Sequence, residues 1–393
     1  MTVCRSCGQT GLQSVLNLGR SPLANVLPSE ADLAKPDRMF PLELVWCPAC
    51  CLVQLTETVP PADLFSEYLY FSSFSDAMLA HARQIAEQLV RERKLNAQSL
   101  ILEIGSNDGY LLQYFQQAGI PVLGIEPAAN IAQEANRKGI RTMNDFFGAT
   151  LAETLPKADV VIGNNVIAHV ADLNGLIRGV ATVLKDDGIG QFEVAYVHDM
   201  LDRVAFDQIY HEHLCYYSLT ALVNLFARHG LRVVDVKIVP MQGQSLQVRV
   251  ARHGEPSAAV KELVDAERAW GLDFYRTFGQ KVEALRGKLR VMLGQFPTVA
   301  GYGAAAKATT LLNYFGFGPE TVQFVVDRSP HKQGRYIPGV RVPIVAPTQL
   351  LERMPAATLL LAWNLVDEVL AQQTEYRQRG GRFVMPIPEP RVI

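Results

Sequence analysis

Short apolar runs alternate with amphipathic segments along most of the chain, and this pattern is the main guide to its fold. Apolar side chains recur at helical spacing in residues 77–95 and 172–184, which predicts amphipathic helices. Apolar runs at 100–104, 121–126 and 188–197 predict strands between and beside them. Strands that alternate with helices predict a largely parallel, doubly wound sheet, so we expect an α/β fold.

The same alternation returns near the C-terminus. Residues 256–294 have the amphipathic pattern of a helical connector. From Val299, "VAGYGAAAKATTLLNYFG" predicts a short strand, a turn of small residues and a helix, and "ATLLLAWN" predicts another strand. A second α/β domain is therefore expected after the connector.

Length and composition narrow the class of protein. A chain of 393 residues exceeds the usual size of a single core, which suggests two or three domains. The net charge of -2 does not favour binding to nucleic acid. No apolar run approaches the roughly 20 residues of a membrane span, and no signal-like segment begins the chain. We expect a soluble, cytoplasmic protein that binds neither nucleic acid nor membrane.

Five of the six cysteines lie in the first 51 residues. Cys4 and Cys7 form one C-x-x-C pair, and Cys47 and Cys50 form another. Two such pairs can surround a zinc ion tetrahedrally with no open position, so we expect a structural zinc site that stabilises a small module. Cys51 is a spare thiol that could replace Cys50. A redox role is less favoured, because redox C-x-x-C motifs occur singly at the start of a helix.

The first strand of the middle domain ends in a glycine turn, "LEIGSNDG". A turn of this kind lets a ligand approach the backbone closely at the carboxyl end of a parallel strand. The turn contains the candidates Glu103, Gly105, Asn107 and Gly109, and its pattern E-x-G-x-x-x-G differs from the G-x-G-x-x-G of dinucleotide-binding proteins. It matches the first motif of class I S-adenosylmethionine (SAM) methyltransferases, and the spacing disfavours a NAD-dependent dehydrogenase.

Further candidates for SAM binding follow the other predicted strands. Glu126 ends the second strand, where a carboxylate can accept hydrogen bonds from ribose hydroxyls. Asp145 and Phe146 suit an adenine that is hydrogen-bonded and stacked. The remaining candidates are Asn164, Asn165 and His169 beside the sulfonium, and Ser73 near the SAM carboxylate.

The second α/β domain carries candidates for a nucleotide-linked substrate. Backbone amides after Gly303 and the point charge of Lys307 suit a phosphate. The other candidates stand at the ends of predicted strands or in the loop after them: Asp327, Arg328, Arg335, Trp363 and Asn364. The competing interpretation is that these charges form an ordinary solvated surface.

Taken in order, these features resemble a known family. The zinc module, the SAM domain, "YHEHLCYYS", "GYGAAAK" and "LLLAWN" are similar to the three-domain sugar C-methyltransferases, which act on nucleotide-linked 4-keto deoxysugars. The resemblance covers essentially the whole chain. It implies a zinc module at 1–70, a class I methyltransferase domain at 71–255, a helical connector at 256–294 and a Rossmann-like, nucleotide-binding domain at 295–393. Cys51 departs from the family, where glycine is expected.

The resemblance also assigns roles within "YHEH". It implies that His213 is the base that removes a proton beside the ketone, a task that suits histidine near neutral pH. Glu212 would hydrogen-bond the site or the substrate, and Tyr210 would orient the keto-sugar or stabilise the enolate. Tyr70 is expected in the same pocket. His211 is a second candidate, and a metal site or a hydrogen-bonded structural loop are the competing interpretations.

The expected activity is SAM-dependent C-methylation of the carbon beside the 4-keto group of a nucleotide-linked deoxysugar. Zinc is expected to be structural, and the protein is expected to be a monomer or a homodimer. An O- or N-methyltransferase acting on a similar sugar is one alternative. A nucleotide-sugar-binding protein without catalytic activity is another.

Overall fold

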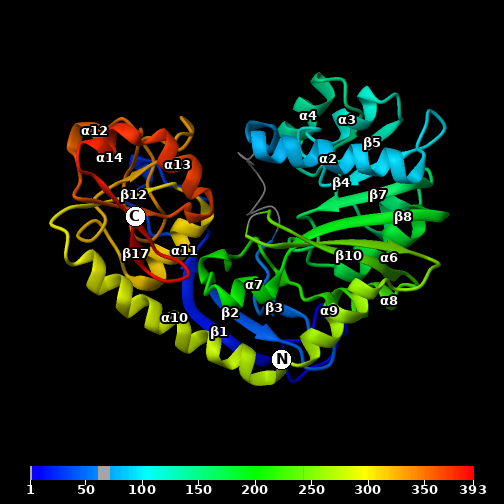
Figure 1. The fold of residues 1–393 in the computed structure, drawn as a ribbon, viewed down its shortest axis with the longest axis horizontal. Coiled ribbons are helices and arrows are strands. Elements are labelled where there is room, and N and C mark those ends of the chain that lie inside the picture. Colours follow the sequence, from blue (N-terminus) through cyan, green and yellow to red (C-terminus); the bar gives the residue numbers. More distant parts are fainter. Residues whose placement is uncertain (1, 61–70, 242) are drawn as a thin grey trace.

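A computed structural model describes residues 2–60, 71–241 and 243–393. These described residues form one four-stranded, one seven-stranded and one six-stranded sheet. In Figure 1 the lobe of the six-stranded sheet lies at the left and that of the seven-stranded sheet at the upper right. The N-terminal strands and the long helix α10 lie below and connect the two lobes.

The N-terminal sheet is antiparallel and has a strand from a distant part of the chain. Its first three strands are β1 (Gln13–Pro22), β2 (Met39–Trp46) and β3 (Val53–Leu55). The fourth, β9 (Cys215–Tyr216), pairs antiparallel with β3. The segment that holds the predicted base therefore continues directly into the N-terminal sheet, a connection that the hydrophobic pattern did not indicate.

The seven-stranded sheet has the strand order β10-β11-β8-β7-β4-β5-β6. Its strands are β4 (Ile101–Ile104), β5 (Val122–Ile125), β6 (Thr142–Met143), β7 (Ala158–Asn164), β8 (Leu184–Ala195), β10 (Arg232–Val239) and β11 (Ser245–Ala251). Only β11 runs antiparallel to its neighbours, β8 and β10. This parallel order with one reversed strand is the class I methyltransferase sheet, and it confirms the predicted α/β class.

Helices precede and connect the strands of this sheet along the chain, as the pattern predicts. They are α2 (Asp76–Arg93), α3 (Leu112–Gln117), α4 (Ala129–Arg137), α5 (Ala149–Ala152), α6 (Leu173–Val183), α7 (Val197–Asp202) and α8 (Leu219–Ala227). Helix α2 begins where Ser75 caps it, because the Ser75 side chain accepts a hydrogen bond from Met78 N. The predicted helices at 77–95 and 172–184 correspond to α2 and α6.

The C-terminal sheet has the order β14-β13-β12-β15-β16-β17, and only β17 is antiparallel. Its strands are β12 (Val299–Tyr302), β13 (Val325–Val326), β14 (Ile344–Val345), β15 (Ala357–Leu360), β16 (Arg382–Met385) and β17 (Arg391–Val392). Its helices are α11 (Ala306–Phe315), α12 (Gln349–Arg353), α13 (Val366–Gln372) and α14 (Thr374–Gln378). The central β12 is flanked on both sides by parallel strands, so this lobe is Rossmann-like as expected.

Two helices occupy the predicted connector, α9 (Ala258–Arg268) and α10 (Gly271–Leu293). The hydrophobic cores also join the parts of the chain. One cluster runs from Leu44 of β2 through Phe278 of α10 to Leu311 of α11. A second contains Cys47 together with Phe192 of the seven-stranded sheet. The N-terminal module therefore packs against both lobes, and the domain boundaries given above stay a prediction. Across the described ranges no helix has both the length and the apolar character that crossing a membrane requires.

Candidate active site and zinc centre

The four predicted zinc ligands lie together. The Sγ atoms of Cys4, Cys7, Cys47 and Cys50 are all within 4.8 Å of one another, and Cys4 Sγ is 3.4 Å from Cys50 Sγ. Zn–S bonds of about 2.3 Å place tetrahedral sulfur ligands about 3.8 Å apart, so the four thiols fit one zinc ion. All four are free cysteines, which leaves each sulfur available as a ligand.

Cys51 does not belong to this group. It has φ 64, and its N–H donates to the Cys47 carbonyl at 2.8 Å, so it closes the turn after the second C-x-x-C pair. A left-handed φ favours glycine, which explains in physical terms why glycine is the expected residue here. Cys50, whose Sγ lies with those of the other three cysteines, therefore fits as the ligand of the second pair better than Cys51.

In residues 105–109, called the SAM loop below, both glycines have the left-handed backbone conformation that glycines in a turn predict. Gly105 has φ 63 and Gly109 has φ 78. A Cβ atom on Gly105 would lie 2.5 Å from Val166 Cγ2, and one on Gly109 would lie 2.9 Å from Ile140 Cγ1. Asn107 also adopts a left-handed φ, of 49, which asparagine tolerates better than most residues. The loop thus follows the end of β4 in a conformation that larger residues would disturb.

Glu126 joins this loop to the end of β5. Its Oε2 accepts a hydrogen bond from Asn107 N at 3.0 Å, and its Oε1 accepts one from Ala128 N at 2.9 Å. Glu126 is 6% exposed, and burial raises the pKa of its carboxyl. Each carboxylate oxygen has a second lone pair, so Glu126 can still accept hydrogen bonds from a ribose. Glu103 lies buried on β4, and burial raises its pKa well above the ordinary value.

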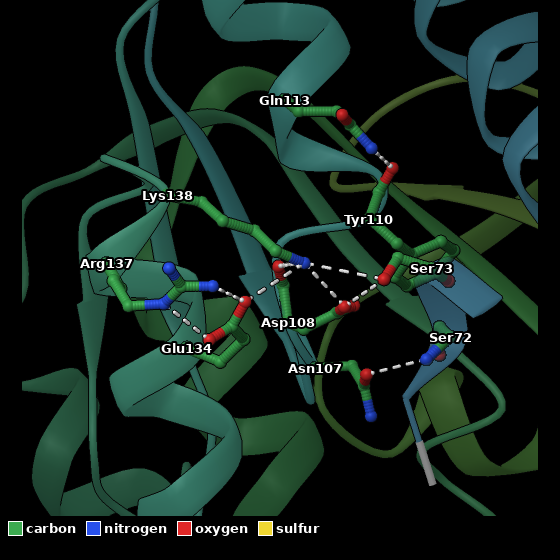
Figure 2. A network of polar contacts seen from close by, with 9 residues as sticks. All are labelled: Ser72, Ser73, Asn107, Asp108, Tyr110, Gln113, Glu134, Arg137 and Lys138. Carbon is green, nitrogen blue, oxygen red and sulfur yellow. Dashed lines mark hydrogen bonds and ion pairs between the residues drawn. The ribbon is translucent and has the colours of Figure 1, made fainter.

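A polar network attaches the segment before α2 to the SAM loop (Figure 2). Ser72 N donates to Asn107 Oδ1 at 2.9 Å. The Ser73 hydroxyl donates to Asp108 Oδ2, which also pairs with Lys138 Nζ at 2.8 Å. Ser73 is thus engaged within the protein, and its contact with the SAM carboxylate stays a prediction.

The other predicted SAM residues follow β6 and β7. Phe146 is 58% exposed, so its ring is available for stacking, and its N–H donates to Asp145 Oδ1 at 2.7 Å. Asn165 has φ 55 and donates through its N–H to the Glu193 carbonyl at 2.7 Å. Asn164 has a buried Oδ1 with no hydrogen-bond partner among the described residues, so this oxygen remains available to a ligand.

His213 lies in a defined hydrogen-bond arrangement. Its Nδ1 is 3.0 Å from the Gln208 carbonyl, and its Nε2 is 2.8 Å from the Tyr210 hydroxyl. A carbonyl can only accept, so Nδ1 carries the proton and Nε2 is the unprotonated nitrogen. The Tyr210 hydroxyl then donates to Nε2. This tautomer presents a basic nitrogen next to a phenol.

The surroundings of His213 favour its neutral form. Burial lowers its pKa well below the ordinary value, and the neighbouring His169 and Lys307 lower it further. The His169 and His213 ring centroids are 4.9 Å apart, and His169 Nδ1 donates to the Glu212 carbonyl at 2.7 Å. His169, predicted beside the sulfonium, is therefore part of the environment of the predicted base.

Glu212 and His211 lie in different environments. The Glu212 carboxylate accepts hydrogen bonds from Asn25 Nδ2 at 2.7 and 2.9 Å, and burial raises its pKa to about 7. His211 is buried, and its Nε2 donates to the Pro41 carbonyl at 3.1 Å. In the described part of the chain, the cysteine cluster is the only grouping of three or more metal-ligating side chains. A metal site at the Tyr210–His213 segment therefore has no support.

The predicted substrate residues of the C-terminal lobe divide into two groups. Lys307 Nζ donates to Asn364 Oδ1 at 3.1 Å and lies 4.6 Å from the centroid of the Trp363 ring. Asp327 Oδ2 accepts a hydrogen bond from Ala304 N at 2.8 Å, just after Gly303. In the same way, Glu126 accepts a hydrogen bond from a backbone amide of the SAM loop. Arg328 instead pairs with Glu368 at the surface, at 2.9 Å, and Arg335 donates to the Leu27 carbonyl at 3.1 Å.

Three residues of this region were missed at the level of sequence: Asn25, Asp207 and Gln208. Asp207 and Gln208 stand directly before "IYHEH", so their position near the motif was a usable signal. Asn25 is 187 residues from Glu212, and nothing in its surrounding sequence indicates the contact. Tyr70 lies outside the described residues.

Fold and site together define a SAM-dependent methyltransferase with a zinc-binding module, and comparisons with known proteins agree. Three family models match successive parts of the chain. They are "Putative zinc binding domain" at residues 4–65, "Methyltransferase domain" at 78–236 and "C-methyltransferase C-terminal domain" at 240–388.

Individual relatives make the assignment more specific. C-methyltransferase NovU from Streptomyces niveus is 37% identical, with 99% of this chain and 96% of that protein covered. A ubiquinone biosynthesis O-methyltransferase from Bradyrhizobium sp. (strain ORS 278) is 30% identical over 27% of this chain and 46% of that protein. Among solved structures, the SAM complex of magnesium protoporphyrin IX methyltransferase from Synechocystis PCC 6803 covers 44% of this chain and 79% of its own, with 16% identity and a TM-score of 0.35.

The chain belongs to the C-methyltransferase family that includes NovU, since the similarity extends over nearly the full length of both proteins. It is a SAM-dependent C-methyltransferase whose N-terminal cysteines form a structural zinc site.

Proposed function

We propose that this enzyme methylates the carbon beside the 4-keto group of a nucleotide-linked deoxysugar. The observation that carries the proposal is the state of His213. Its Nδ1 donates to the Gln208 carbonyl, which leaves Nε2 as a proton acceptor 2.8 Å from the Tyr210 hydroxyl. Enolate formation needs these two groups, a base for the carbon acid and a donor for the developing oxyanion.

The reaction then follows from these atoms. His213 Nε2 removes the proton from the carbon next to the ketone, and the C–H electron pair becomes the enolate. The Tyr210 hydroxyl moves its hydrogen bond from Nε2 to the enolate oxygen as negative charge develops there. When bound, SAM supplies the methyl group, so that the new C–C bond forms as the S–CH₃ bond breaks and S-adenosylhomocysteine (SAH) leaves. Glu212 hydrogen-bonds the acceptor sugar.

The C-terminal lobe supports a nucleotide-linked acceptor. The turn at Gly303 has φ 95 and precedes α11, so the N-terminal end of this helix faces the carboxyl end of β12, where a phosphate can lie. Lys307 supplies a positive charge near the first turn of α11. Arg328 is 65% exposed, and its surface pair with Glu368 is worth about 0–1 kcal/mol, so this guanidinium can exchange its partner for a diphosphate.

Product analysis tests the proposed function. The purified enzyme is incubated with SAM and a panel of nucleotide-linked 4-keto-6-deoxysugars, and the products are examined by mass spectrometry and ¹³C NMR. We expect one methyl group on the carbon beside the ketone. A methyl group found on oxygen or nitrogen, or no transfer to any keto-sugar while the corresponding hydroxy- or aminosugars are methylated, would overturn the proposal.

A further inference from the structure

A buried acidic residue, Asp207, lies on the turn that precedes the Tyr210–His213 segment. This turn, η3 (Phe206–Gln208), places the Asp207 side chain out of contact with solvent. Asp207 Oδ2 accepts a hydrogen bond from the indole Nε1 of Trp363 at 2.7 Å. Its Oδ1 has no hydrogen-bond partner within the described ranges. A buried carboxylate with an unpaired oxygen is costly, so it requires a stabilising neighbour.

Lys307 places a positive charge next to Trp363, the hydrogen-bond partner of Asp207. Its Nζ lies 4.6 Å from the centroid of the Trp363 ring, within the range of a cation–π contact. Trp363 therefore binds Asp207 through its N–H and Lys307 through its ring face. Burial raises the pKa of Asp207 to about 6, and the Lys307 charge opposes this rise. Burial lowers the pKa of Lys307, and the Asp207 charge opposes that fall.

The same turn holds the predicted base. The carbonyl of Gln208, the next residue after Asp207, accepts the hydrogen bond from His213 Nδ1. On the other side, the Ile209 carbonyl accepts a hydrogen bond from Thr310 Oγ1 of α11 at 2.9 Å. The turn is thus bonded both to the base and to the helix that carries the Lys307 charge. A shift of Asp207 would move the carbonyl that sets the tautomer of His213.

We propose that Asp207 is a positioning residue for methyl transfer. It fixes Trp363 and the Lys307 ammonium of the C-terminal lobe relative to His213, so that the acceptor sugar and its base are aligned. The inference rests on the proposed function and extends it to a residue that acts through others. Misplacement of reacting groups by about 1 Å can cost about 10²-fold in rate, which sets the scale of the expected effect.

Two variants test this role by breaking the same link from opposite ends. Asp207→Asn keeps an acceptor for the indole N–H and removes the charge, whereas Trp363→Phe keeps a ring face for Lys307 and removes the N–H. With the keto-sugar that the wild-type enzyme methylates best, we expect each variant to lower kcat about 10- to 100-fold. The KM for SAM should change less than twofold. The double variant should be no slower than the slower single variant, because both remove one interaction.

Controls separate positioning from folding and from the chemistry itself. Rates are normalised to the fraction of enzyme that binds SAH, and Asp202→Asn, an exposed acid at the end of α7, is the matched variant expected to match wild type. Near-normal kcat in Asp207→Asn, or fully additive losses in the double variant, would overturn the inference. If His213→Asn retained normal turnover, the proposed function would fail instead, whatever the Asp207 variants showed.

Discussion

Replacing Glu126 with glutamine should weaken SAM binding by a predictable amount. The carboxylate accepts hydrogen bonds from two backbone amides, Asn107 N at 3.0 Å and Ala128 N at 2.9 Å. Glutamine keeps one accepting oxygen, but its NH₂ group faces the other amide, so one buried N–H loses its partner. Leaving a buried donor unpaired costs about 1–3 kcal/mol. The SAM loop should therefore be less stable in Glu126→Gln.

The same substitution removes the charge that the ribose hydroxyls would meet. Hydrogen bonds to a charged group are worth about 1.5–3 kcal/mol each, against about 0.5–1.5 kcal/mol for neutral pairs. The difference of about 1–1.5 kcal/mol for each of two ribose hydroxyls amounts to about 2–3 kcal/mol, which corresponds to a roughly 30- to 160-fold higher Kd. We expect this change for SAH, which carries the same adenosyl group and does not react.

Isothermal titration calorimetry with SAH, at a pH where wild-type binding is tight, measures this effect. Glu87→Gln is the matched control, because Glu87 is exposed on α2 and should leave the Kd unchanged. A thermal melt of each variant reports the loss of loop stability separately. If Glu126→Gln bound SAH within twofold of wild type while its Tm fell, the carboxylate would only brace the loop and the ribose assignment would be wrong.

Two further outcomes follow from the zinc site and from Glu212. Elemental analysis should find one zinc per chain in wild type and in Cys51→Ser. Cys50→Ser should contain little zinc, and its fold should be destabilised. Retained zinc in Cys50→Ser would contradict the proposed set of four ligands. Burial raises the pKa of Glu212 to about 7 from its ordinary 4.5, so the folded state holds the proton more tightly. The resulting stability is present below about pH 4.5 and is lost as the pH rises through 7. The Tm of Glu212→Gln relative to that of wild type should therefore increase between pH 5 and 8. A difference in Tm that stays constant over this range would contradict the raised pKa of Glu212.

Periodic segments and short motifs were the predictable part of this protein. Helix α2 and strand β8 were predictable from local apolar spacing. The helix buries one face, and most of the strand is buried on both faces, so each has a regular apolar pattern. The turn formed by the glycines of the SAM loop was also predictable from the sequence. A positive φ and a close approach to Val166 restrict position 105 to glycine.

Long-range contacts were not predictable from local patterns. The pairing of β9 with β3 and the hydrogen bonds of Asn25 to Glu212 join residues that are far apart in the chain. Such contacts depend on how the N-terminal module packs between the lobes, and no local spacing encodes this packing. The hydrogen bond from Arg335 to the Leu27 carbonyl is another such contact, and the role of Arg335 in substrate binding stays a prediction.

Exchange of the acidic hydrogen of the acceptor with solvent tests the central claim most directly. The enzyme is incubated in D₂O with SAH and the nucleotide-linked 4-keto-6-deoxysugar that it methylates, and ¹H NMR follows the carbon beside the ketone. We predict rapid exchange by wild type and at least about 10²-fold slower exchange by His213→Asn, with SAH binding unchanged. Equal exchange rates in the two proteins would contradict the assignment of His213 as the base.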